Sequence, residues 1–196
     1  MIKINENGRS MVEMLGVLAI IGVLSAGGLA GYSKAMFKHK MNSTLDQLTM
    51  LVTNIRTMYG TQDNYTGLTP AQAIKLGIIP TAMQNGASKL VSPFKGEVTI
   101  TTDKAASGGI DATAFVVTYK GLPSEACINL ATADWGSGAG SGFIGVKAAA
   151  DASASAAAHY VGTTVDGRKE GEPYTVANAI SACGNANTSS VSLKFY

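Results

Sequence analysis

The stretch that decides the fold is residues 14–33, which read MLGVLAIIGVLSAGGLAGYS, twenty residues without a charge. As a helix rising 1.5 Å per residue, this stretch is about 30 Å long, which is the thickness of a bilayer's hydrocarbon core. Lys3 and Arg9 precede the stretch, and a basic group, residues 34–40, follows it. The sequence therefore predicts a membrane-spanning helix close to the N-terminus.

A cleavable secretory signal is the simplest alternative, and residues 25–27 (Ser-Ala-Gly) have the small side chains of a cleavage site. Two observations disfavour it. The apolar run continues past that site, and Glu13 stands at the head of the run, where an ordinary signal or anchor would not place a carboxylate.

The helical pattern continues beyond the apolar run. Apolar residues recur at alternating spacings of four and three, and no proline occurs before Pro70. We therefore predict one long helix over residues 9–59, with a membrane-spanning part (14–33) and an amphipathic part (34–59). The stripe comprises Met41, Leu45, Leu48, Val52, Ile55 and Tyr59.

Composition excludes several classes of protein. The chain has 196 residues, of which 46% are apolar and 14% are charged, and its net charge is +2. This apolar content argues against intrinsic disorder, and the near-neutral charge without a basic block argues against a nucleic-acid-binding protein. Two cysteines far apart exclude a zinc ribbon or a disulfide-dense miniprotein.

Residues 60–196 are expected to form a globular domain. Thr69 is predicted to cap a short helix over 68–76 that begins with Pro70 and stops at Gly77. The sequence predicts strands at 96–101, 114–119 and 190–196, a turn at 120–123 and a helix at 124–132. Residues 136–142 are expected to form a flexible link, and residues 146–160 either a helix or a low-complexity loop.

The N-terminus combines a leader, a small residue and a carboxylate ahead of the apolar run. A short polar leader with a lysine ends at Gly8, the residues Arg9-Ser10-Met11-Val12-Glu13 follow, and the apolar run comes next. This arrangement resembles the N-terminus of a type IV pilin precursor. The resemblance implies that a membrane aspartyl peptidase cuts between Gly8 and Arg9, that Arg9 is then N-methylated, and that Glu13 becomes the fifth residue. Arg9 departs from the family, which usually has an apolar residue there.

The rest of the chain is similar to the type IVb class of pilins, in the stretches GIIPTAMQNGASKLVSPFKGEVTI (77–100) and FVVTYKGLPSEACINL (115–130). The resemblance implies an α+β type IV pilin fold: a long N-terminal α-helix packed on an antiparallel β-sheet, with a C-terminal region bounded by a Cys127–Cys183 disulfide. The domains would be a leader (1–8), the helix (9–59) and a globular head (60–196). Buried free thiols are the default for a cytosolic chain, but a membrane segment in front favours an oxidising compartment and a disulfide.

Glu13 has two interpretations. It can be a helix-start carboxylate favoured by the helix dipole and paired with Arg9. The resemblance implies instead that it binds the free α-amine of Arg9 on a neighbouring subunit inside a fibre. His39 and His159 stand apart from each other and from carboxylate clusters, and Trp135 is expected to be a packed aromatic, so we predict no catalytic, metal or cofactor site.

These features predict a structural protein, not an enzyme: a pilin that polymerises as a homo-oligomeric helical filament, an extracellular type IV pilus serving adhesion, aggregation, motility or DNA transfer. Its expected partners are prepilin peptidase, the pilus assembly machinery and, before assembly, the inner membrane; no cofactor and no nucleic acid are expected. The alternatives are a pseudopilin of a type II-like secretion system and a membrane-anchored periplasmic binding protein.

Overall fold

The computed structural model describes residues 11–136, 142–185 and 187–196. The chain divides into two compact units, residues 1–40 and residues 41–196. The first unit is described from Met11 and consists of the first part of helix α1 (Met11–Tyr59). The prediction of one uninterrupted long helix is confirmed from Met11 onward, and residues 9 and 10 lie outside the described part.

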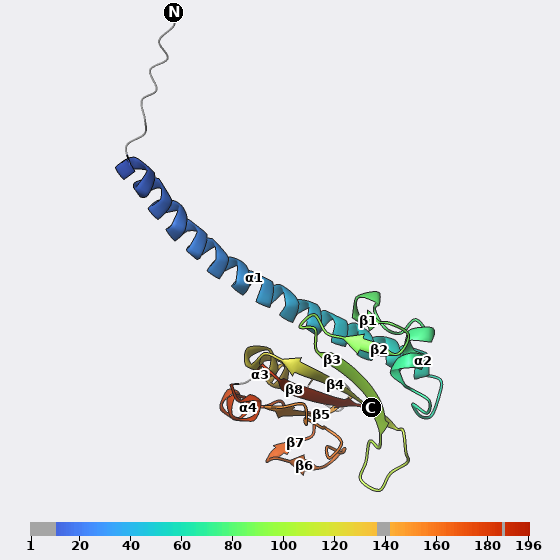
Figure 1. Cartoon of the computed structure of the whole chain (residues 1–196). Coiled ribbons are helices and arrows are strands. Elements are labelled where there is room, and N and C mark those ends of the chain that lie inside the picture. Colours follow the sequence, from blue (N-terminus) through green and yellow to red (C-terminus); the bar gives the residue numbers. More distant parts are fainter. Residues whose placement is uncertain (1–10, 137–141, 186) are drawn as a thin grey trace, which may run out of the picture. The chain divides into compact units, whose positions relative to one another are not determined.

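The second unit is built on a six-stranded antiparallel sheet with the strand order β1-β2-β3-β4-β8-β5 (Figure 1). The last strand in sequence therefore lies inside the sheet, between β4 and β5, and β5 forms one edge. The strands are β1 (Gln84–Asn85), β2 (Lys89–Val91), β3 (Glu97–Asp103), β4 (Ala114–Leu122), β5 (Phe143–Ala149) and β8 (Ser189–Phe195).

Shorter elements complete this unit: α2 (Pro70–Lys75), the 3-10 helix η1 (Thr81–Met83), α3 (Ser124–Thr132), α4 (Val176–Cys183) and the hairpin of β6 (Thr164–Val165) with β7 (Arg168–Lys169). The Thr69 side chain accepts a hydrogen bond from the Gln72 N–H, as expected for the helix cap, and Pro70 begins α2. The helix predicted over 124–132 has the predicted bounds.

Strand β8 shows how the two faces of the sheet are covered. Phe195 faces the part of α1 beyond residue 40, where the Arg56 guanidinium lies 5.7 Å from the centre of its ring, and residues 191 and 193 share that face by strand alternation. An aromatic chain joins Tyr65, Phe115, Phe195 and Phe143 on that side, with ring centroids 4.9–5.6 Å apart. The buried residues of α1 all belong to the second unit: Met41, Thr44, Leu48, Leu51, Val52, Ile55 and Tyr59. The predicted stripe is thus confirmed except at Leu45, which is half-buried.

The other face of β8 carries Ser190, Ser192 and Lys194, and these polar residues are also buried. Residues 151–157 lie along this face. The Ala154 N–H donates to Ser190 Oγ, the Ala156 N–H donates to Ser192 Oγ, both at 3.0 Å, and Lys194 Nζ donates to the Ala157 carbonyl at 3.2 Å. The small side chains of this Ala/Ser-rich segment allow its backbone to approach the strand closely.

Two local predictions are wrong. The turn expected at 120–123 is the end of β4, which continues to Leu122 through a register shift against β8 between Tyr119 and Leu122. Gly121 has φ 65°, so the glycine that suggested a turn accommodates this irregularity instead. Residues 146–149, expected as helix or loop, belong to β5, whereas 150–160 form the expected loop. Within the link expected at 136–142, residues 137–141 lie outside the described residues.

Candidate assembly site

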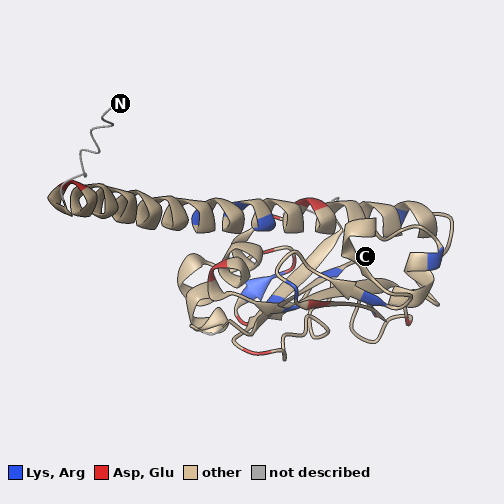
Figure 2. Ribbon diagram, turned by 45° about the horizontal axis from the view of Figure 1, so that its top comes forward, with Lys and Arg blue, Asp and Glu red and all other residues tan. Residues whose placement is uncertain are grey.

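The apolar run of α1 exposes large hydrophobic side chains around the helix. Met11, Val12, Leu15, Leu18, Val23 and Leu29 each expose more than half of their surface. Figure 2 shows an uncharged stretch of α1 that follows the acidic first turn and precedes a basic group. Water-soluble monomers rarely expose contiguous apolar surfaces of this size, so the run is suited to contact with lipid or with other helices.

By length and hydropathy, α1 qualifies as a membrane span, with a mean hydropathy of 2.1 in its most apolar window. Five glycines interrupt the apolar surface, and the space that a Cβ atom would occupy at each of them is open. Such positions allow the backbone of a second helix to come close. The glycines are Gly16, Gly22, Gly27, Gly28 and Gly31.

Glu13 lies in the first turn of α1 and is exposed. A carboxylate is favourable there because the free backbone N–H groups and the helix dipole attract negative charge. Its apolar neighbours Met14, Val17 and Leu18 are exposed as well, so a helix that packed against them would place Glu13 in a dry environment. The predicted processing residues Gly8 and Arg9 lie outside the described residues.

The predicted disulfide is present between Cys127 on α3 and Cys183 at the end of α4. Both half-cystines are fully buried, and their Cα atoms are 5.9 Å apart. Ser124 Oγ donates to the Gly184 carbonyl, and Ser189 Oγ donates to the Cys183 carbonyl at 2.8 Å. The disulfide therefore joins α3 and α4 beside the start of the central strand β8.

A buried ion pair supports the polar face of the sheet. Lys194 Nζ lies 2.9 Å from Asp103 Oδ2 and 4.2 Å from the centre of the Tyr160 ring. The Lys194 side chain has no exposed surface, whereas Asp103 keeps 22% of its side chain exposed. The sequence did not single out this pair, since alternating polar residues in a strand usually indicate a face in water.

His159 is buried against β5, where a Cβ atom at Gly145 would clash with its ring. Burial, reinforced by the charge of Arg168, lowers its pKa to about 4, so the imidazole is neutral at pH 7. Burial also raises the pKa of Tyr119, which packs in the core. These shifts stem mainly from desolvation inside the fold.

The described residues contain no group of three or more His, Cys, Asp or Glu side chains placed to hold a metal ion. Trp135 is half-buried, and its indole N–H donates to the Leu130 carbonyl at 3.1 Å, which agrees with the packed aromatic expected from the sequence. Within the described residues, the exposed apolar part of α1 with Glu13 in its first turn is the surface that we take as the candidate site.

Comparison with protein families matches residues 34–195 to the family described as Bundlin. The "Major structural subunit of bundle-forming pilus" of Escherichia coli O111:H- is 25% identical over 184 residues, which covers 93% of this chain and 90% of that protein. The subunit of the same description from Escherichia coli O127:H6 (strain E2348/69 / EPEC) has the same identity and coverage.

Two solved structures share the fold. A type IVb pilin from Salmonella typhi superposes with a TM-score of 0.51 at 20% identity, covering 78% of this chain and 97% of that chain. TcpA, a type IV pilin from the Vibrio cholerae El Tor biotype, superposes with a TM-score of 0.54 at 18% identity, covering 81% and 99%. At these identities the likeness concerns the fold alone, and it confirms the predicted fold class.

Proposed function

This chain belongs to the Bundlin family, and we propose that it is a pilin, a structural subunit that polymerises through its apolar helix into an extracellular type IV pilus. The family match over residues 34–195 carries this conclusion. The exposed apolar run supplies the physical means, because a surface that suits a bilayer also suits a bundle of identical helices.

We propose further that a prepilin peptidase removes residues 1–8 and that the new terminus at Arg9 is N-methylated. Cleavage after Gly8 makes Glu13 the fifth residue and places a free amine about one helical turn before it. It also removes Lys3 and Glu6, so the mature chain begins close to its apolar run. N-terminal sequencing of purified fibres should start at Arg9; a start at Met1 or after Ala26 would refute this assignment.

Glu13 is proposed to guide docking. An isolated carboxylate inside a bundle of apolar helices is costly, and the α-amine of Arg9 on a neighbouring subunit would neutralise it. A neighbour displaced along the fibre by about four residues, or about 6 Å, brings its Arg9 level with Glu13. Each subunit therefore has a preferred axial position, which the apolar surface alone does not impose.

The test is Glu13→Gln, which keeps the size and polarity of the side chain and removes its charge. Close charge pairs at interfaces contribute about 1.5 kcal/mol or more, so we expect a loss of about tenfold or more in sheared surface fibres. The variant should still be cleaved and should accumulate in the membrane. Asp46→Asn is the matched control, because Asp46 is an exposed carboxylate on the same helix. Normal fibre yield from Glu13→Gln would refute the docking role and leave Glu13 as a carboxylate that stabilises the start of the helix.

A pseudopilin of a type II-like secretion system is the nearest alternative, and a membrane-anchored periplasmic binding protein is the next. The family match favours the pilin over both. Electron microscopy of cells that express this chain at its natural level separates them, since a pilin forms long surface fibres.

A further inference from the structure

Strand β5 forms an edge of the sheet, so one row of its backbone N–H and C=O groups points away from the neighbouring strand β8. β5 is seven residues long and pairs with β8 on one side. Its sequence, FIGVKAA, is mostly apolar and has a single charge. An open edge of this kind is a template for pairing with a strand of another copy.

Residues 164–174, called the strap below, occupy this edge. The Gly171 N–H donates to the Ile144 carbonyl at 3.1 Å, Arg168 Nη2 donates to the Val146 carbonyl at 2.8 Å, and the Ala148 N–H donates to Tyr174 Oη at 3.4 Å. One backbone group and two side chains thus occupy positions where a neighbouring strand would bind.

Arg168 is the centre of the strap. Its guanidinium stacks on the Tyr174 ring, 3.7 Å from the ring centre, and its Nη1 donates to the Glu172 carbonyl at 3.2 Å. Only 7% of the Arg168 side chain is exposed. Arginine stacked and hydrogen-bonded in this way is held in one orientation, so its bond to β5 is directional.

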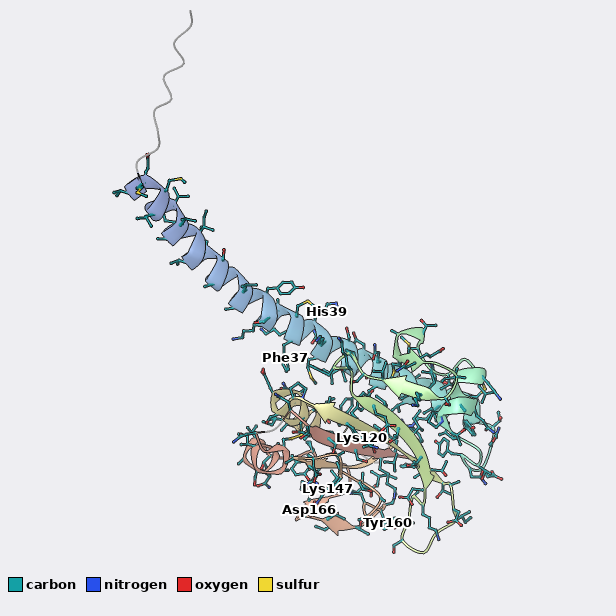
Figure 3. The ribbon with its side chains drawn as sticks, in the orientation of Figure 1. Phe37, His39, Lys120, Lys147, Tyr160 and Asp166 are labelled. Atoms are coloured by element: carbon teal, nitrogen blue, oxygen red, sulfur yellow. A yellow bond between two sulfur atoms is a disulfide. The ribbon has the colours of Figure 1, made fainter. Side chains whose placement is uncertain are left out.

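The strap begins with the β6–β7 hairpin, whose Asp166-Gly167 turn has φ values of 53° and 75°. Both central residues have positive φ, as in the turns that tightly connected hairpins favour. Asp166 Oδ2 also accepts a hydrogen bond from Lys147 Nζ of β5 at 2.5 Å, and Figure 3 shows these two side chains next to each other. This ion pair fixes the turn to the strand that the strap covers.

A short hairpin has little stability of its own, so the strap depends on its contacts with β5. Its two strands pair at Thr164–Lys169 and Val165–Arg168. Loss of the Arg168 contacts should therefore release the strap and leave the core of the sheet intact, because local openings cost less than global unfolding.

We propose that the strap is a guard, which keeps the β5 edge from accepting a strand of a second copy of this chain. The opposite edge strand, β1, is only two residues long and offers little for pairing. The strap thus restricts association of the globular units through their sheet and leaves assembly to other surfaces. This inference does not depend on the docking role of Glu13.

The test uses the full chain in detergent micelles and the variant Arg168→Met, which keeps an apolar stem and removes the guanidinium. Amide hydrogen exchange should become about tenfold faster or more at Ala148 and Gly171, whose N–H groups donate in the contacts between β5 and the strap, and stay unchanged in β3. Loss of about 1.4 kcal/mol in local stability corresponds to that factor. The variant should also associate with rising concentration and bind a dye specific for cross-β structure. Lys169→Met is the matched control, because Lys169 is the exposed next residue of the same strand.

A second variant, Tyr174→Phe, removes only the hydroxyl that accepts from Ala148, and it should speed exchange at that amide alone. If Arg168→Met unfolds the whole second unit, which fast exchange in β3 would reveal, exchange at Ala148 in Tyr174→Phe takes its place as the test, and an unchanged rate there would overturn the proposal. Exchange at Ala148 and Gly171 equal to that of Lys169→Met, or an exposed β5 edge in a variant that stays unassociated, would overturn the proposal.

Discussion

The buried Lys194–Asp103 ion pair offers the sharpest prediction about stability. Lys194→Met keeps an unbranched apolar side chain in the same space and removes the ammonium group. Asp103 then loses the donor at 2.9 Å, although it retains its bond from the Lys104 N–H and part of its exposure to water. We expect the free energy of unfolding to fall by about 2–3 kcal/mol, which is below the usual cost of breaking a fully buried pair.

The reverse change, Asp103→Asn, should cost more, about 3–5 kcal/mol, because it leaves the fully buried ammonium of Lys194 without its counter-charge. The double variant removes both charges and should cost less than the two single changes together. A coupling energy of about 1.5 kcal/mol or more is the expected result of this cycle.

The matched control is the more exposed pair Lys120–Glu97, with a contact of 3.0 Å and side chains 33% and 58% exposed. Lys120→Met should cost about 1 kcal/mol or less, since water already solvates both groups. Urea unfolding of the full chain in micelles, followed by the fluorescence of Trp135, measures all four variants. Equal costs for Lys194→Met and Lys120→Met would refute the reasoning from burial.

The remaining predictions concern the disulfide and the buried histidine. Replacing Cys127 and Cys183 by serine should lower the free energy of unfolding by about 4 kcal/mol, the chain-entropy value for a closed loop of this length, and make residues 127–183 susceptible to protease; unchanged protease resistance would count against this role. The pKa of His159 is lowered to about 4 by folding, so the unfolded state binds a proton first as the pH falls. This contribution to stability is complete above about pH 6.5 and is lost progressively as the pH falls toward 4, with a slope of up to about 1.4 kcal/mol per pH unit. The slope between these pH values should be smaller in His159→Phe, and equal slopes would contradict the assignment.

The parts of the fold that depend on local sequence were predictable. An apolar stripe at helical spacing without a proline defined the long helix, and a threonine followed by a proline defined the start of α2. The disulfide was predictable in a different way, from a family resemblance combined with two cysteines behind a membrane segment. In these cases, a few neighbouring residues or one pair of cysteines determine the structural element.

Strand β5 was missed because its conformation is decided elsewhere in the chain. The residues Val-Lys-Ala-Ala-Ala (146–150) favour a helix by intrinsic propensity. They become mostly strand because β8, more than forty residues later, pairs with Val146 through Ala149. Tertiary pairing of this kind overrides propensity and leaves no local signal.

The end of β4 was misread for a related reason. The Lys-Gly-Leu-Pro sequence at 120–123 is typical of a turn. In the structure Gly96 lies so close to this segment that a Cβ atom there would be 1.7 Å from the Lys120 carbonyl oxygen. The glycines at 96 and 121 thus allow two chain segments to approach each other closely. The requirement for glycine at these positions becomes visible only when the pairing of the strands is known.

The core of the second unit is built without the apolar run of α1, which bears on the proposed assembly. Every buried residue of α1 lies at or beyond Met41, and the sheet, the disulfide and the buried Lys194 pair all belong to residues 41–196. The apolar run therefore supplies none of the buried residues of this core, and in the proposed assembly its exposed side chains exchange lipid for the helices of other subunits. Because both environments are apolar, the exchange itself changes the hydrophobic free energy little, and the direction of assembly must come from other interactions. In the proposed docking role, the carboxylate of Glu13 and the Arg9 amine of a neighbouring subunit are one such interaction, so Glu13→Gln should reduce assembly while processing and membrane insertion continue.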